Sequence, residues 1–225
     1  MALDAHIKAI GFDMDGTVMD TKVDYVKLAR VVEDEFIDLG VPTEVIDQDK
    51  VASTMNYGIK WLMENKPESL VGMEKRIGDR ATVIECENAS IAKPFPGAVE
   101  LIKDLKSMGY KVAILTRGGR EYAEKILTAS GIIGLFDALV ARDDYPQAEA
   151  KPSPKSMEHM CEKIGVDPKD TIYVGDGTVD WLTAVNSGSQ FIGVESGHTD
   201  REAWVKAAGA DIVTVPTVAE IRQFL

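Results

Sequence analysis

The sequence predicts an α/β fold, in which helices sandwich a parallel, Rossmann-like sheet and a helical domain is inserted into the chain. Three observations lead to this prediction. A short apolar run near the start resembles a buried strand, a long region after it shows only helical patterns, and strand and helix patterns alternate from residue 94 onward. Such alternation is typical of a parallel sheet with helices on both faces.

The first expected elements are a strand and a helix. Residues 7–12, IKAIGF, form the apolar run. Over residues 22–39 the apolar side chains recur every three or four positions, which predicts an amphipathic helix. Gly40 and the Val-Pro pair after it end this helix. The side chains expected on its inner face are Tyr25, Leu28, Val32, Phe36 and Leu39.

The region up to about residue 90 is expected to stay helical, with segments at 50–66 and 73–89. No run of β-branched residues interrupts it, so it contains no candidate strand for the sheet. We therefore expect residues 21–90 to form a separate helical domain. The α/β core is then discontinuous and consists of residues 1–20 and 91–225.

The alternating part of the chain predicts the rest of the core. Its strands are expected at 110–116, 138–142, 170–176, 189–194 and 211–215, and its helices at 98–109, 120–131 and 154–165. The first of these helices should turn inward Ala98, Leu101, Ile102, Leu105 and Met108. In the last one, Ser153 is expected as the N-cap and Pro154 as the first helical residue, where a missing N–H costs nothing.

Composition excludes several classes of function. The net charge is −12 and the pI is about 4.7, so no nucleic-acid partner and no anionic membrane surface is expected. The two cysteines, Cys86 and Cys161, lie far apart and have no metal-ligand spacing, which favours a reducing compartment. No signal peptide and no apolar stretch of spanning length is visible, so a cytoplasmic location is expected.

Two aspartates, Asp13 and Asp15, end the first predicted strand and are followed by Gly-Thr. Side chains at positions i and i+2 of a strand point the same way, so both carboxylates can face one site. Open α/β sheets bind ligands at the carboxyl ends of their strands. Two carboxylates there repel each other unless a cation is present, and Mg²⁺ suits them. The alternative is turn formation and helix capping, because Asp before Gly is common in turns.

Three later segments place polar groups at or near other strand ends. Thr116, followed by Arg117 and two glycines, resembles an anion site at a helix start. Lys151 stands before a proline, which favours an extended backbone at the lysine. Asp176 ends a further strand, and Asp180 follows four residues later. Capping or solvent exposure would account for each group alone. Together with Asp13 and Asp15, however, these groups predict one site with four carboxylates, a hydroxyl and an ammonium.

Four motifs carry a resemblance to a known family: FDMDGTVMD, ILTRGG, KPSP and YVGDGTVD. In this order and at these spacings they resemble the motifs of the haloacid-dehalogenase-like (HAD) superfamily, in its phosphoglycolate phosphatase and β-phosphoglucomutase-like branch. The resemblance covers residues 1–20 and 93–215. The region inserted after the first motif resembles the helical cap of many small-molecule phosphatases in this family.

The resemblance implies a phosphoric monoester hydrolase that forms an aspartyl-phosphate. Asp13 would be the nucleophile, and Asp15 would be the general acid to the leaving group and then the general base to water. Thr116 would hydrogen-bond the transferring phosphoryl group, and Lys151 would neutralise charge on phosphate and nucleophile. An acid at position 15 favours ester chemistry, because an alkoxide needs a proton on leaving and a halide does not.

The resemblance also implies Mg²⁺ as the cofactor. Asp176 would ligate it, helped by an oxygen of Asp13 and the carbonyl of Asp15. Asp180 would be a further ligand or an acid behind the ligands, and which of Asp176 and Asp180 binds directly stays open. Arg117 stands where many relatives carry Asn, and it could contact phosphate, contact a substrate carboxylate or point to solvent.

The implied substrate is a small phosphorylated metabolite, with phosphoglycolate as the first candidate. In this family the cap usually sets specificity by closing over the site. The cap residues to test are Lys60, Arg76, Arg80, Tyr57 and Trp61, although a solvated helix face or a core position would also explain them. The three histidines, His6, His159 and His198, have no motif context and are expected to be structural or exposed.

Three alternative functions remain open at this stage. A phosphomutase would use the same aspartyl-phosphate but return the phosphoryl group to a sugar. A signalling receiver domain also combines acids, a hydroxyl and a lysine on an α/β sheet, but it takes its phosphoacceptor from a later strand. A binding protein without catalysis would have no use for the costly acid cluster. The sequence does not decide between a monomer and a homodimer.

Overall fold

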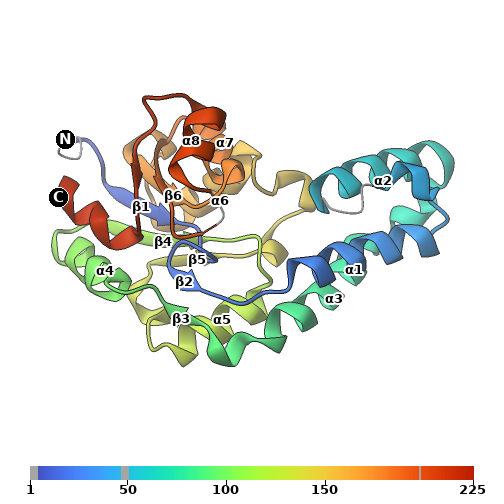
Figure 1. Ribbon diagram of the computed structural model, residues 1–225, viewed down its shortest axis with the longest axis horizontal. Helices are drawn as coiled ribbons and strands as arrows, with labels where there is room; N and C mark the ends of the chain where they lie inside the picture. Colours follow the sequence, from blue (N-terminus) through green and yellow to red (C-terminus); the bar gives the residue numbers. More distant parts are fainter. Residues whose placement is uncertain (1–4, 47–50, 198) are drawn as a thin grey trace. The chain divides into compact units, whose positions relative to one another are not determined.

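The computed structural model describes residues 5–46, 51–197 and 199–225 (Figure 1). The chain divides into two compact units. The sheet unit consists of Met1–Thr21 and Ser90–Leu225, and the helical unit consists of Lys22–Ala89. No helix among the described residues is both long enough and apolar enough to cross a membrane.

The sheet unit is built on six parallel strands in the order β5-β4-β1-β6-β7-β8. They are β1 (Ala9–Phe12), β4 (Lys111–Leu115), β5 (Ala138–Val140), β6 (Thr171–Gly175), β7 (Gln190–Val194) and β8 (Thr214–Val215). The first strand therefore lies in the middle, between β4 and β6. All six predicted strands exist, with shorter bounds than expected, and the predicted α/β class is confirmed.

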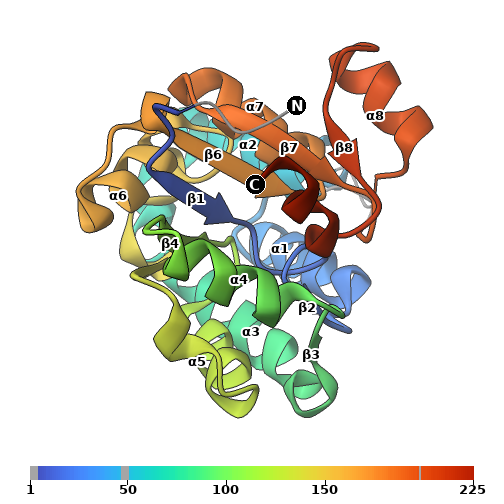
Figure 2. The same ribbon diagram turned by 90° about the vertical axis from the view of Figure 1, so that its left-hand side faces the viewer.

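Helices cover both faces of this sheet. They are α4 (Ala98–Ser107), α5 (Arg120–Ala129), α6 (Pro154–Ile164), α7 (Thr178–Ser187) and α8 (Arg201–Ala208). On one face α6 and α7 pack side by side against the strands, whereas α4 and a C-terminal 3₁₀ segment, Val218–Phe224, pack on the other (Figure 2). Ser153 caps α6 as predicted, since its hydroxyl accepts a hydrogen bond from the backbone N–H of Lys155.

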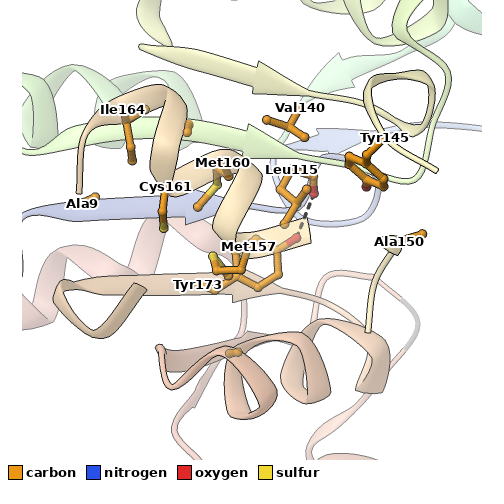
Figure 3. Packing of buried hydrophobic residues seen from close by; sticks show 12 residues of the cluster. Ala9, Leu115, Val140, Tyr145, Ala150, Met157, Met160, Cys161, Ile164 and Tyr173 are labelled. Atoms are coloured by element: carbon orange, nitrogen blue, oxygen red, sulfur yellow. Dashed lines mark hydrogen bonds between the residues drawn. The ribbon is translucent and has the colours of Figure 1, made fainter. Parts of the chain in front are cut away.

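The core on the α6 face shows how closely helix and sheet approach (Figure 3). Met157, Met160 and Cys161 of α6 pack on alternate residues of the central strands. A Cβ atom on Gly11 of β1 would lie only 2.5 Å from Cε of Met160. Glycine at this position therefore lets α6 pack directly on the middle strand, because any larger residue would push the methionine away.

The chain leaves and re-enters the sheet unit through a two-stranded antiparallel ribbon. In it β2 (Met19–Asp20) pairs with β3 (Lys93–Pro94). The backbone N–H of Phe95 also donates to the carbonyl of Val18, at 2.9 Å. The two connections to the helical unit are thus tied to each other beside β1.

The helical unit has its own apolar core. Its helices are α1 (Tyr25–Asp38), α2 (Val51–Asn65) and α3 (Met73–Glu87). Phe36 of α1 is fully buried and lies against α2, where a Cβ atom on Gly58 would come within 2.5 Å of its ring. The buried cluster consists of Val31, Val32, Phe36, Val41, Met55, Leu62, Met73 and Ile77.

Two residues expected to face inward are exposed, and two helices, α7 and α8, were not predicted. Tyr25, the first residue of α1, is 47% exposed, and Met108, just after α4, is 53% exposed. Both lie at helix ends, and periodicity indicates which face is buried but not how far along the helix burial extends. The unpredicted helix α8 is only eight residues long. Its Trp204 is fully buried, so packing stabilises a helix that is too short to show a clear period.

Candidate active site

The predicted polar residues meet because three neighbouring strands end beside one another. Asp13 directly follows β1, Thr116 follows β4, and Asp176 follows β6. The register pairs Phe12 of the middle strand with residues 114 and 174 of its neighbours. All three polar side chains are buried. The carboxyl edge of the sheet, on both sides of β1, therefore forms one polar site, as expected for an open α/β sheet.

Lys151 connects the acids of this edge. It comes from the loop before α6, and its side chain is only 3% exposed. Its Nζ lies 2.6 Å from Oδ1 of Asp13 and 2.6 Å from Oδ1 of Asp180. The same ammonium donates to the hydroxyl of Tyr173 at 3.0 Å. That hydroxyl in turn donates to the carbonyl of Leu115 at 2.8 Å (Figure 3). The lysine is thus held by three side chains of the sheet unit rather than exposed.

Burial and charge both perturb this cluster. Burial alone would lower the pKa of Lys151, but the carboxylates of Asp13 and Asp180 raise that pKa well above the ordinary lysine value. Burial raises the pKa of Asp13 well above its ordinary value, against the opposing effect of Lys151. Asp180 and Asp176 raise the pKa of Asp13 further. One ammonium therefore does not balance the negative charge of these acids, and a cation would.

Three of the acids have the arrangement that a metal ion needs. Asp13, Asp176 and Asp180 are buried and can each offer one carboxylate oxygen, with these oxygens within 4.8 Å of one another. Hard divalent cations prefer such oxygen ligands. The oxygens of Asp180 have other partners, because Oδ1 accepts from Lys151 and Oδ2 accepts from the backbone N–H of Gly177 at 3.0 Å. Both carboxylate oxygens of Asp180 are therefore already engaged within the protein.

Glycines make room for two of these carboxylates. A Cβ atom on Gly197 would lie 1.9 Å from Oδ2 of Asp176, and one on Gly16 would lie 2.5 Å from the same oxygen. Gly16 also has a φ of +78°, which side chains rarely tolerate. A Cβ atom on Gly175 would lie 2.3 Å from Cβ of Asp180. The glycines thus allow the backbone to surround the carboxylates closely, as a small cation site requires.

Substitution of Gly175 by alanine tests this packing. We expect the variant to be less stable by about 1–3 kcal/mol, because the added methyl overlaps Asp180 in a buried site. We also expect a higher Mg²⁺ concentration for half-maximal activity, since Asp180 must move. Urea denaturation and a Mg²⁺ titration of activity measure the two effects.

Gly134→Ala is the matched control, because a Cβ atom on Gly134 would meet nothing within 4 Å and its φ is not positive. If the Gly175 and Gly134 variants had the same unfolding free energy and needed the same Mg²⁺ concentration, the close packing around Asp180 would have no role.

Thr116 and Arg117 lie on the β4 side of the site. The Thr116 hydroxyl is buried and accepts a hydrogen bond from the backbone N–H of Gly118 at 2.9 Å. Arg117 is half-buried rather than extended into solvent. Burial lowers its pKa, while the negative charges of Asp180 and Asp13 act in the opposite direction. Its guanidinium therefore contributes positive charge to the same edge of the sheet.

Asp15 lies at the edge of the acid group and has different partners. Its side chain is half-buried, and its Oδ1 accepts hydrogen bonds from the hydroxyls of Thr21 and Tyr122, each at 2.7 Å. It is not among the three described acids whose carboxylate oxygens lie within 4.8 Å of one another. The two aspartates of the first motif therefore have separate surroundings, one among acids and an ammonium, the other between hydroxyls.

Sequence reasoning missed Tyr122, Tyr173 and Gly197 as members of this site. Tyr122 and Tyr173 are 1% and 0% exposed, and in the sequence they look like ordinary apolar positions of a helix and a strand. The only available signal was position, because Tyr173 lies on β6 three residues before Asp176, which follows that strand. Gly197 follows β7, whose end was not considered as part of the site.

The residues singled out in the helical unit have partners or packing there. Arg76 pairs with Glu35 at 2.6 Å, and Arg80 pairs with Asp34 at 3.3 Å. Trp61 packs against the apolar cluster of that unit. Tyr57 and Lys60 are exposed on α2. These contacts give a structural explanation for Arg76, Arg80 and Trp61, and leave Tyr57 and Lys60 as the candidates for a ligand.

His6, His159 and the buried Cys161 lie apart from this chemistry. His6 is exposed, and His159 stacks on Tyr145 with its Nε2 2.5 Å from Glu149. His198 lies outside the described residues. Burial raises the pKa of Cys161 to about 11, which keeps its thiol neutral and unreactive at ordinary pH.

Comparison with known proteins gives the family. The family model of haloacid dehalogenase-like hydrolases matches residues 7–188, which include all four motifs. The chain is a haloacid dehalogenase-like hydrolase. The resemblance inferred from the motifs is confirmed, and so is the prediction of an enzyme. The receiver-domain alternative is excluded by this match.

Relatives of this hydrolase resemble it along most of its length. A phosphoglycolate phosphatase of Haemophilus influenzae (strain 86-028NP) is 25% identical, with coverage of 87% of this chain and 89% of the relative. One of Pasteurella multocida is 27% identical, with coverage of 93% and 98%. CbbY from Rhodobacter sphaeroides, solved in complex with phosphate, has the same fold at a TM-score of 0.63, with 22% identity and 96% coverage of both chains.

Proposed function

We propose that this hydrolase is a Mg²⁺-dependent phosphatase that cleaves a small phosphate monoester through an aspartyl-phosphate on Asp13. The observation that carries the proposal is the buried Lys151 ammonium between Asp13 and Asp180, 2.6 Å from each, at the carboxyl edge of the sheet. A positive group fixed beside a carboxylate suits a nucleophile that must approach an anionic phosphate. The phosphatase names of the relatives support the same reaction.

The proposed reaction has two steps. A carboxylate oxygen of Asp13 attacks phosphorus, the bond between phosphorus and the ester oxygen breaks, and Asp15 gives its proton to the departing alkoxide. Asp15, now ionised, then takes a proton from water, whose oxygen attacks the phosphorus of the aspartyl-phosphate. Phosphate leaves, and both carboxyl groups return to their starting states. Lys151 and the hydroxyl of Thr116 are proposed to hold the phosphoryl oxygens throughout.

The acid cluster supports the assignment of a cation. We propose that Asp13, Asp176 and the backbone carbonyl of Asp15 hold Mg²⁺, and that Asp180 positions Lys151 and the backbone of Gly177. When bound, the ion supplies positive charge that neutralises the phosphoryl oxygens and the nucleophile. The raised pKa of Asp13 is consistent with this need, because a cation would favour the ionised nucleophile.

Phosphoglycolate is the first substrate to test, since the relatives described above carry that name. Its carboxylate is a second anionic group, for which we propose Arg117 as the partner. The half-buried guanidinium of Arg117 supports this assignment. We further propose that residues 22–89 are the cap that selects the substrate, because they are inserted directly after the first motif as in the resembling family. A cytoplasmic location remains a prediction, and neither Cys86 nor Cys161 forms a disulfide.

Removal of the metal tests the proposal directly. Phosphate release is measured on a panel that includes phosphoglycolate and hexose phosphates, with Mg²⁺ or with EDTA. We expect EDTA to lower the rate on the order of 10³-fold, because a metal ion supplies several kcal/mol of transition-state stabilisation. Added Mg²⁺ in excess should restore the rate.

Two results would contradict a metal-dependent phosphatase. One is equal release with EDTA and with Mg²⁺. The other is conversion of one hexose phosphate into another without free phosphate, which ³¹P NMR detects and which would identify the phosphomutase alternative.

A further inference from the structure

Tyr122 lies in the first turn of α5 and reaches across to the first motif. Its side chain is 1% exposed, and its hydroxyl donates to Oδ1 of Asp15 at 2.7 Å. The hydroxyl of Thr21 donates to the same oxygen, also at 2.7 Å. One carboxylate oxygen of Asp15 is therefore held by two hydroxyl groups from different segments of the sheet unit.

The local sequence makes room for this contact. A Cβ atom on Gly118 would lie 3.0 Å from Cδ1 of Tyr122 and 3.3 Å from the hydroxyl oxygen of Thr116. Glycine at this position therefore lets the aromatic ring pass close to the β4 end of the site. The ring is locked in place by burial, so the phenolic oxygen has little freedom. A fixed donor of this kind can fix the orientation of the carboxylate that it contacts.

We propose that Tyr122 is a positioning residue, which orients Asp15 for proton transfer to the leaving group of the substrate. The inference rests on the proposed phosphatase function. Because Oδ1 of Asp15 accepts the two hydroxyl hydrogen bonds, the transferable proton is carried on Oδ2. When the bond between phosphorus and the ester oxygen breaks, this proton goes to the ester oxygen, which leaves as an alcohol.

Esters with different leaving groups separate this role from a general structural one. An alkyl phosphate releases a strongly basic alkoxide, so its cleavage depends on the proton from Asp15. A 4-nitrophenyl phosphate releases a weakly basic phenolate, which leaves without a proton. Loss of orientation at Asp15 should therefore slow the first reaction and spare the second, whereas damage to the site as a whole would slow both.

The test is Tyr122→Phe, which removes one oxygen and keeps the buried ring. General acid catalysis contributes about 10²–10⁴-fold, and the Thr21 contact remains, so we expect kcat for an alkyl phosphate to fall about 10-fold. The kcat for 4-nitrophenyl phosphate should stay within about twofold of wild type. Tyr110→Phe is the matched control, because Tyr110 precedes the amino end of β4 and should change neither rate.

A double variant provides a second test that does not depend on absolute rates. In the background of Asp15→Asn, Tyr122→Phe should lower the rate on the alkyl ester no further, because the group that it positions is absent. Equal losses on both esters, no loss on either, or an additional loss in the Asp15→Asn background would overturn the positioning role. A wild-type enzyme that releases phosphate from neither ester would instead overturn the proposed function, and the inference with it.

Discussion

Replacement of Asp13 by asparagine is expected to lower phosphate release by at least about 10³-fold, because the amide cannot form the aspartyl-phosphate. The fold should survive the change. Burial raises the pKa of Asp13, so a neutral side chain of the same shape suits this position, and Lys151 keeps Asp180 as a partner at 2.6 Å. Activity and thermal unfolding, measured on the same preparation, separate loss of chemistry from loss of structure.

Trapping of the phosphoenzyme makes this prediction specific. Wild-type protein mixed with labelled substrate and quenched in acid should carry a label that hydroxylamine removes, and the Asp13→Asn variant should carry none. Asp79→Asn is the matched control, since Asp79 is 65% exposed on α3 and should leave both activity and label unchanged. Label on the Asp13→Asn protein, or turnover close to wild type, would show that another residue is the nucleophile.

Replacement of Lys151 by methionine should affect stability as well as catalysis. The ammonium is the positive partner of two buried carboxylates, and its side chain is only 3% exposed. Removing one partner of a buried ion pair leaves charge without compensation and costs about 3–5 kcal/mol of unfolding free energy. Turnover should also be lost, because the lysine is the proposed contact to the phosphoryl oxygens. Urea denaturation and the phosphate-release assay measure the two effects.

Lys8→Met is the control for this variant. Lys8 also lies 2.6 Å from an aspartate, Asp170, but its side chain is 66% exposed, and exposed ion pairs contribute little to stability. Mg²⁺ should stabilise the Lys151→Met protein more than it stabilises wild type, because the unpaired acids gain a cation. Similar stability of the Lys8 and Lys151 variants would mean that the buried pair contributes no more than a surface pair.

Most of the sheet could be predicted from the sequence, because its strands are short apolar runs between turn residues. β1, β4 and β6 carry runs such as AIGF and TIYVG, which no helical pattern imitates. The ribbon of β2 and β3 could not be predicted, since two residues per strand show no period. Its formation depends on the chain returning to the same place after the inserted unit, which is tertiary information.

The candidate site was predictable wherever a polar residue ended a strand. Asp13, Thr116 and Asp176 could be placed together from topology alone, because their strands are neighbours. The roles of Tyr122 and Tyr173 could not be predicted, because a buried tyrosine in an apolar run is ordinary core until the position of its hydroxyl is known. That position depends on packing, for example on the space beside Gly118.

The ribbon of β2 and β3 also bears on how such a protein can change over evolution. The chain departs at Asp20 and returns at Lys93, and these residues face each other in the ribbon. An excursion that starts and ends at one point can vary in length and content at small entropic cost, because loop closure depends only on the logarithm of length. The ribbon is thus a position in the sheet unit at which unrelated inserts can be exchanged, while the acids beside β1 keep their places.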